Sequence, residues 1–251
     1  MLAIPTFWLS CSWVPETVLE AINKVARAFL WSNGSNKGIY LVSWGKVTQP
    51  KREGGLGVRS LQLTGSSLLG KQVFRVLNGE DAIWIKIVNG KYGGLHPWRQ
   101  GNWRTTSGVW KALYKTARVI RMGCRKLIDD GRDSAAADDP WTSAVPWRWK
   151  PRILHSDLLR MELSVAEVLR SRSNSGHNLV GVAGLELAFE IASTTLATSE
   201  VKDTWIWWPH TLGIPKPSSI YRFLKPTEEE VWPGWRGLWK LKVAPRVQMF
   251  C

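Results

Sequence analysis

The sequence predicts a mainly α-helical protein, resembling a helical bundle, with a few short strands in its C-terminal half. Apolar residues recur at spacings of three and four over residues 15–31, 60–77 and 107–120, which is the pattern of amphipathic helices. Clusters of Gly, Asn and Ser separate these stretches and indicate helix ends. Strand-like sequence is limited to short runs such as TWIWW at 204–208.

The first predicted helix covers residues 15–31. Its apolar residues form one stripe, made of Val18, Leu19, Ile22, Val25, Ala26, Phe29 and Leu30. Pro15 suits the first turn, and Glu16 favours the positive end of the helix dipole. The sequence NGSN then ends the helix. The following run IYLVSW, at 39–44, is either a short strand or simply apolar packing.

Two more helices are predicted before residue 93. Ser60 caps the first of them, which continues to Leu77 and ends at Asn-Gly. Gly65 and Gly70 within it either weaken the helix or allow a close contact with a neighbouring helix. Asp81 opens the second, a short helix that the sequence YGG closes.

A fourth helix follows a loop at 93–106 and begins at Ser107. Its inward side is expected to hold Val109, Trp110, Leu113, Tyr114, Ala117 and Ile120. The rest of the chain is predicted to form a linker rich in Asp, Pro and Trp, then helices at 153–172 and 177–200, the TWIWW strand, and a turn into a last helix at PKPSSIYRFL. This predicts three parts: a basic helical domain at 1–126, a linker at 127–152, and a region of helices and short strands at 153–251.

Positive charge is concentrated in the first half of the chain. The formal net charge is +14, and residues 1–126 hold 19 Lys and Arg against 5 Asp and Glu, whereas residues 127–251 hold 15 of each. A basic half predicts contact with a polyanion such as nucleic acid. The residues expected to contact phosphates are Lys51, Arg52, Lys111, Lys115, Arg118, Arg121 and Arg125.

The glycine cluster EGGLG at 53–57 raises the possibility of a phosphate-binding loop. A P-loop requires Lys and then Ser or Thr after its second Gly, but Val-Arg-Ser follows Gly57. A dinucleotide fingerprint requires a preceding strand and the spacing GxGxxG, and both are missing here. The expected structure is therefore a tight turn that leads into the helix at Ser60.

No other motif predicts a catalytic or metal site. The sequence LIDDG at 127–131 could belong to a two-metal polymerase hairpin, but basic residues replace the apolar strands that such a hairpin needs. The later aspartates lack the spacing of a calcium loop, and the four histidines are scattered. We expect no enzyme activity, no metal and no cofactor.

Cysteine usage and the N-terminus favour a soluble protein of a reducing compartment. The chain has three cysteines, more than 100 residues apart, which does not suit a disulfide framework. Its apolar first residues reach Glu16 too soon to span a bilayer. No targeting signal is evident, so a nuclear or cytoplasmic location without membrane contact is expected.

The first 92 residues contain a set of residues that, in order and spacing, resembles a known family. The set is Ile4, Pro5, Pro15, Phe29, Leu30, Trp31, Trp44, Pro50, Lys51, Glu53, Gly54, Gly55, Leu56, Gly57, Val58, Leu61, Leu69, Lys71, Trp84, Lys91 and Tyr92. It resembles the segment that follows the reverse transcriptase domain in plant LINE-type (non-LTR) retrotransposon polyproteins.

A weaker resemblance continues along the chain. Ile128, Asp130, Gly131, Arg132, Asp139, Pro140 and Trp141 are similar to the family's IGDGR and DPW linker, with Asp129 in place of its usual Gly. Asp203, Trp205, Gly213, residues 219–222 and residues 238–247 look like the start of the family's reverse transcriptase zinc-binding domain. Pro215 and Pro217 depart from that pattern and put its local strand in doubt.

The resemblance implies that the polymerase aspartates lie before Met1 and that the zinc ligands lie after Cys251. The chain is then expected to be a non-catalytic, retroelement-derived fragment of a polyprotein, and its other parts are expected partners. Its basic half would bind RNA or an RNA–DNA hybrid with low specificity. The alternative is a structural or protein-interaction fragment, or a pseudogene product, without independent function.

Overall fold

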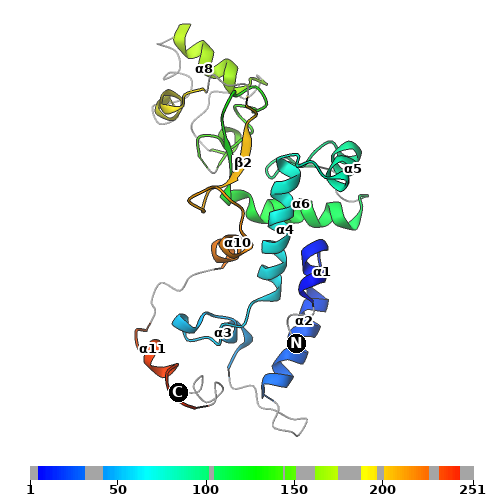
Figure 1. Cartoon of the computed structure of the whole chain (residues 1–251), viewed down its shortest axis with the longest axis vertical. Coiled ribbons are helices and arrows are strands. Elements are labelled where there is room, and N and C mark those ends of the chain that lie inside the picture. The colour runs from blue at the N-terminus through cyan, green and yellow to red at the C-terminus, as the bar shows by residue number, and fades with distance from the viewer. Residues whose placement is uncertain are drawn as a thin grey trace. The chain divides into compact units, whose positions relative to one another are not determined.

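The computed structural model describes residues 5–31, 42–101, 105–143, 145–150, 162–174, 188–196, 201–225 and 232–243. The fold is mainly α-helical with one two-stranded antiparallel sheet, so the predicted fold class is confirmed (Figure 1). Two compact units make up the chain. We call Met1–Leu69 with Tyr221–Cys251 the terminal unit and Gly70–Ile220 the central unit.

The terminal unit consists of short and medium helices and contains a small apolar core. Its elements are α1 (Thr6–Cys11), α2 (Glu16–Trp31), α3 (Trp44–Val47), the 3-10 helix η1 (Lys51–Glu53), the first half of α4 (Leu61–Leu77), the end of α10 (Pro217–Leu224) and α11 (Trp235–Leu238). Leu9, Leu19 and Leu61 form the core. Gly65 admits Leu9, because a Cβ there would lie 3.1 Å from the Leu9 side chain. This is the close helix contact that the glycine predicted.

The structure differs from the sequence prediction in two parts of this unit. Helix α2 matches the predicted range, but only part of its apolar stripe is covered: Leu19 and Ala26 are buried, whereas Val18, Val25 and Phe29 are exposed. The run at 39–44 lies partly outside the described residues, and its last residue, Trp44, begins α3.

The central unit contains the sheet and a larger apolar core. Its elements are the second half of α4, α5 (Ile83–Tyr92), α6 (Gly108–Ile120), the 3-10 helix η2 (Arg121–Gly123), β1 (Cys124–Leu127), the 3-10 helix η3 (Trp147–Trp149), α8 (Val165–Asn174), β2 (Thr204–Trp207) and the start of α10. Helix α6 crosses the second half of α4 near Gly70, where a Cβ would lie 3.4 Å from Ile120 (Figure 1).

Strand β1 pairs with β2 in an antiparallel register that places Cys124 opposite Trp207 and Lys126 opposite Trp205. These four residues are buried, and the intervening Arg125 and Ile206 are half-buried, as the two-residue period of a strand requires. The strand predicted at TWIWW is therefore confirmed. Its partner β1 was not predicted.

The core of the central unit is formed by the 136–147 segment, α8 and the helical residues 188–193. It contains Ala136, Trp141, Trp147, Val165, Val168 and Ile191. Helix α8 overlaps the end of the helix predicted at 153–172 and extends beyond it to Asn174. Residues 188–193 are helical within the range predicted at 177–200. Residues 151–161 and 175–187 lie outside the described residues. Among the described residues, no helix combines the length and apolar character needed to cross a membrane.

Candidate nucleic-acid interface

The glycine cluster forms a tight turn directly after η1, as the sequence predicted. Gly54 and Gly57 have φ values of +83° and +72°, which L side chains rarely adopt. Gly55 has no room for a side chain, because a Cβ would meet the carbonyl oxygens of Gln49 and Lys46. Each of the three glycines is thus required by backbone geometry or packing.

The turn presents Lys51 and Arg52 to solvent. The Lys51 ammonium lies 5.7 Å from the centre of the Trp239 ring, and the Lys51 carbonyl accepts a hydrogen bond of 2.7 Å from Trp239 Nε1. Arg52 Nε lies 3.1 Å from Glu53 Oε1, while 65% of its side chain remains exposed. Glu53 itself is buried, with Lys225 Nζ 4.0 Å from its second oxygen. The two basic side chains are therefore anchored and exposed.

Helix α6 carries Lys111, Lys115 and Arg118 on one stripe. All three side chains are half-buried, and Arg118 lies over the Tyr114 ring at 6.0 Å. The opposite side is more deeply covered than predicted, with Trp110, Ala112, Leu113, Tyr114, Thr116, Ala117 and Ile120 buried. Val109, expected to face inward, is 48% exposed. Ser107 caps the helix by accepting a hydrogen bond from the Trp110 backbone, as predicted.

Arg121 and Arg125 do not continue this stripe, because α6 ends at Ile120. Arg121 lies in η2 with its guanidinium 4.8 Å from the centre of the Trp98 ring. Arg125 lies in β1 and donates hydrogen bonds of 3.2 and 2.7 Å to the carbonyls of Trp141 and Thr142. Its guanidinium also stacks 4.1 Å from the Trp208 ring. Burial lowers the pKa of Arg125, and the charge of Glu190 opposes that shift.

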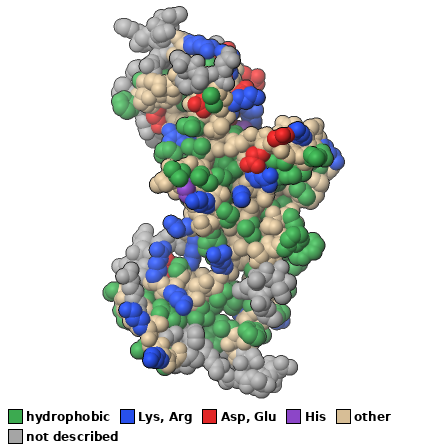
Figure 2. All heavy atoms as spheres, viewed as in Figure 1, with side chains coloured by type: hydrophobic (Ala, Val, Ile, Leu, Met, Phe, Trp, Pro, Cys, Tyr) green, Lys and Arg blue, Asp and Glu red, His purple; other side chains and the backbone are tan. Residues whose placement is uncertain are grey.

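The seven predicted phosphate contacts therefore fall into separate groups. Lys51 and Arg52 belong to the terminal unit and the other five to the central unit. Of those five, Lys111, Lys115 and Arg118 share one helix face. Lys and Arg side chains dominate the charged groups on the face shown in Figure 2. Arg125 differs from the rest because the fold itself uses its hydrogen-bond donors.

The central unit contains a buried ionic cluster that the sequence did not predict. Asp139, 3% exposed, accepts hydrogen bonds from His96 Nε2 at 2.7 Å and from Lys126 Nζ at 2.9 Å. His96 Nδ1 accepts from the backbone N–H groups of Trp98 and Arg99, so the proton of the neutral ring must lie on Nε2. The Asp of the DPW sequence was visible in the sequence, but its partners His96 and Lys126 lie 43 and 13 residues away in the chain. Their contact with Asp139 could therefore not be predicted.

The partners of Asp139 decide how its carboxyl group ionises. Burial raises its pKa, but the hydrogen bond from His96 and the positive charge of Lys126 outweigh burial, so the pKa of Asp139 lies below its usual range. In the folded state the Asp139 carboxyl group therefore keeps its negative charge to a lower pH than it does in the unfolded chain.

We expect this carboxylate to make stability depend on pH at the acidic end. Its stabilising contribution is fully present above the unfolded pKa, about 3.9 for Asp, and is lost as the pH falls through the lower folded-state pKa. Urea unfolding at a series of pH values should show the difference between wild type and Asp139→Asn shrinking below about pH 4. A difference that stays constant down to about pH 2 would contradict this assignment.

The LIDDG sequence forms a turn held by a distant aspartate. Asp203 Oδ1 accepts hydrogen bonds from the backbone N–H groups of Asp129 at 2.7 Å and Gly131 at 3.1 Å, and Ser134 Oγ donates to Asp203 Oδ2. Gly131 has a φ of +69°. These bonds fix the turn against the start of β2. Within the described ranges, no group of three or more His, Cys, Asp or Glu side chains could hold a metal ion.

Two Arabidopsis thaliana proteins are similar to the chain. The protein named "Putative ribonuclease H protein At1g65750" is 30% identical over 153 residues, which cover 57% of this chain and 24% of that protein. The protein named "Uncharacterized mitochondrial protein AtMg00310" is 25% identical over 143 residues, which cover 56% of this chain and 93% of that protein. The chain thus spans about a quarter of the ribonuclease H protein's length. No family model and no solved structure matches the sequence.

These relatives correct one expectation and support another. We expected from the sequence that the chain has no enzyme activity, but the 30% identical relative is named as a ribonuclease H, which is an enzyme. That finding overturns the expectation. Both relatives are plant proteins, in agreement with the plant retroelement origin that the sequence predicts.

Proposed function

We propose that the chain is a nucleic-acid-binding segment of a plant LINE-type retroelement polyprotein. It binds RNA or an RNA–DNA hybrid through phosphate contacts and does not read the base sequence. The basic stripe on α6 carries this proposal, with Lys51 and Arg52 as a second group. The ribonuclease H name of one relative agrees with RNA as the ligand.

The geometry of α6 suits a phosphate backbone. Lys111 and Arg118 lie seven positions apart, with Lys115 between them, which is about 10 Å at the helical rise of about 1.5 Å per residue. One strand of a duplex presents a phosphate about every 3.4 Å along its axis, so the stripe covers about three phosphates. No acidic residue lies in α6, and the net charge of the first 126 residues adds long-range attraction.

The test is the salt dependence of binding. Replacing Lys111, Lys115 and Arg118 by Ala should lower the slope of log K against log salt by about 2 to 3, because each lost phosphate contact removes about 0.7 to 0.9. Fluorescence anisotropy with a labelled RNA–DNA hybrid across a salt series measures this slope.

A matched control removes the same charge elsewhere. Lys24, Lys86 and Lys202 are exposed, and replacing these three by Ala changes the net charge equally. The control should leave most of the slope intact. Equal losses in the two variants, or an affinity indifferent to salt in the wild type, would rule out a phosphate site on α6.

A protein-interaction function is the second candidate, and exposed apolar side chains favour it. Phe7, Trp8, Val25 and Phe29 are between 52% and 74% exposed on α1 and α2. Surfaces of this kind commonly bind other protein segments. Other parts of the polyprotein are the proposed partners. Sedimentation of the same samples separates the two functions, since self-association without nucleic acid would favour this one.

The C-terminal segment provides the remaining part of the proposal. Asp203, Trp205 and Gly213 lie in or beside β2, and residues 219–222 lie in α10. We assign this segment to the start of a zinc-binding domain of the LINE-type family, on the strength of the sequence resemblance alone.

A further inference from the structure

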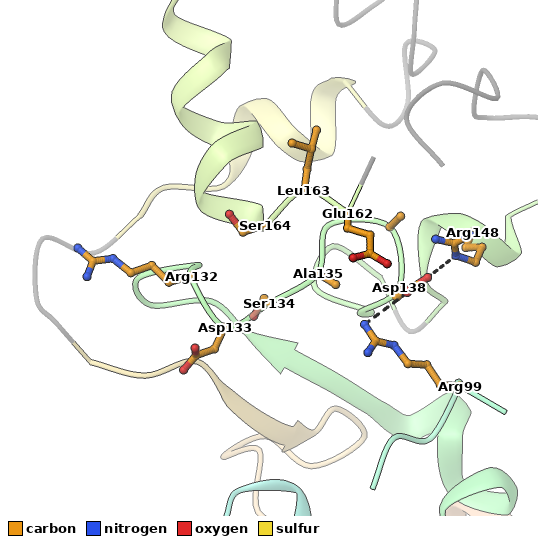
Figure 3. Close-up of a pocket in the computed structure, with 11 residues that line it drawn as sticks. Arg99, Arg132, Asp133, Ser134, Ala135, Asp138, Arg148, Glu162, Leu163 and Ser164 are labelled. Carbon is orange, nitrogen blue, oxygen red and sulfur yellow. Dashed lines mark hydrogen bonds and ion pairs between the residues drawn. The ribbon is translucent and has the colours of Figure 1, made fainter. Parts of the chain in front are cut away.

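Two adjoining pockets form a groove in the central unit, apart from the α6 stripe. The larger, of about 540 Å³, lies between the 132–138 segment and the residues before α8 (Figure 3). The smaller, of about 330 Å³, is lined by Trp98, Arg99, Gln100, Asp138, Arg148 and Trp149. Arg99, Asp138 and Arg148 line both pockets, so the two pockets lie next to each other.

The charged lining of the smaller pocket is net positive, whereas Asp133 and Glu162 also line the larger pocket and balance its arginines. Arg99 and Arg148 approach the same carboxylate, Asp138, from two sides (Figure 3). Two guanidinium groups facing one carboxylate leave a net positive charge. Both arginine side chains stay accessible, at 56% and 43% exposed.

Trp149 supplies an exposed aromatic surface beside these charges. Its side chain is 45% exposed, and its ring meets Trp98 at 43°, so the two indoles are not stacked face to face. Exposed aromatic rings beside arginines are the usual construction of single-strand binding surfaces, where bases stack on the ring and phosphates meet the charges.

The segment that carries Trp149 is held firmly. Trp147, its neighbour in η3, is buried in the core and donates a hydrogen bond of 3.1 Å to Thr142 Oγ1. The Arg148 backbone N–H donates to the Ala137 carbonyl at 2.9 Å. A fixed backbone loses little freedom when a ligand binds, which favours a preformed site.

We propose that this groove binds single-stranded nucleic acid, with one base stacked on Trp149 and the neighbouring phosphates held by Arg99 and Arg148. The smaller pocket lies at the lower end of ligand-site volumes, which suits one unpaired base better than a duplex. The site uses residues other than those of the α6 stripe, and it goes beyond the proposed function by selecting for an unpaired strand.

The test compares a labelled oligo-uridine with a blunt RNA–DNA hybrid of equal length at one salt concentration. Trp149→Ala should raise the Kd for the single strand by about 5- to 100-fold, the usual effect of losing one stacked base, and change the Kd for the hybrid less than about twofold. Trp149→Phe keeps a ring and should restore most of the single-strand affinity. Arg99→Ala should also weaken the single strand more than the hybrid.

The control is Trp8→Ala, since Trp8 is also exposed but lies in the other unit. It should leave both affinities unchanged, and circular dichroism confirms that each variant folds. Equal weakening of both ligands by Trp149→Ala, or none for the single strand, would overturn the groove site. The α6 variant tests the proposed function through hybrid binding, whereas Trp149→Ala tests the groove through single-strand binding. Failure of one proposal can therefore be distinguished from failure of the other.

Discussion

Replacing Asp139 by Asn is expected to cost the central unit about 3 to 5 kcal/mol, because it leaves Lys126 buried without its counter-charge. The Lys126 side chain is only 10% exposed, so water cannot replace the carboxylate. An amide in this position would also bring donors toward Lys126 Nζ and the Ala135 N–H, which both donate to Oδ2 of Asp139. Total stabilities of about 5 to 15 kcal/mol make this a large fraction.

Urea unfolding followed by tryptophan fluorescence and circular dichroism measures the loss. The matched control is Asp81→Asn, which removes the same charge from an exposed ion pair with Lys86 and should have no measurable effect. Adding Lys126→Met to Asp139→Asn should recover part of the loss, since the uncompensated charge is then gone. A cost for Asp139→Asn no larger than that of the control would show that the buried pair does not stabilise the fold.

The helices could be predicted from the sequence because their signals are local. Ser107 and the apolar spacing after it place the start of α6 correctly, and Gly65 correctly indicates a close contact. The extent of burial could not be predicted in the same way. Val18, Val25 and Phe29 fit the apolar stripe of α2, but tertiary packing covers only the Leu19 side of it.

The end of α6 and strand β1 depend on distant residues. The basic residues after Ile120 continue a helical pattern in the sequence, yet Gly123 lies directly against the Trp207 ring, and residues 124–127 pair with residues about 80 positions later. Strand propensity is set by such neighbours more than by the strand itself. For this reason the sequence could place Arg125 among the phosphate contacts although its guanidinium is engaged by Trp141, Thr142 and Trp208.

The groove and the ionic cluster could not be predicted from the sequence either, because they also depend on residues that are distant in the chain. The composition of residues 127–152 predicts a linker, but the span contains buried Trp141, Trp147 and Asp139 and the exposed Trp149. Composition can show that tryptophans are frequent. It cannot show which of them pack in a core and which lie beside arginines, because that depends on residues such as Arg99 and Val165 elsewhere in the chain.

Trp207→Ala is expected to destabilise the central unit by about 3 to 5 kcal/mol, because it removes a large side chain that is completely buried. The Trp207 ring contacts Phe74 edge-to-face with centroids 6.0 Å apart, and its Nε1 donates a hydrogen bond of 3.0 Å to Ser219 Oγ. Gly123 packs against the same ring. The substitution therefore leaves a cavity where α4, β1 and α10 meet, and Ser219 loses its partner.

Trp208 is the natural control, because it is the next residue, lies on the opposite side of the chain and is 55% exposed. Trp208→Ala removes the same side chain but only the stacking on Arg125, so its cost should stay near or below about 1 kcal/mol. Trp207→Phe should fall between the two, since it keeps a ring but loses the bond to Ser219. Chemical denaturation of the three variants gives this order. Equal effects of Trp207→Ala and Trp208→Ala would mean that the buried face of β2 does not organise the core of the central unit.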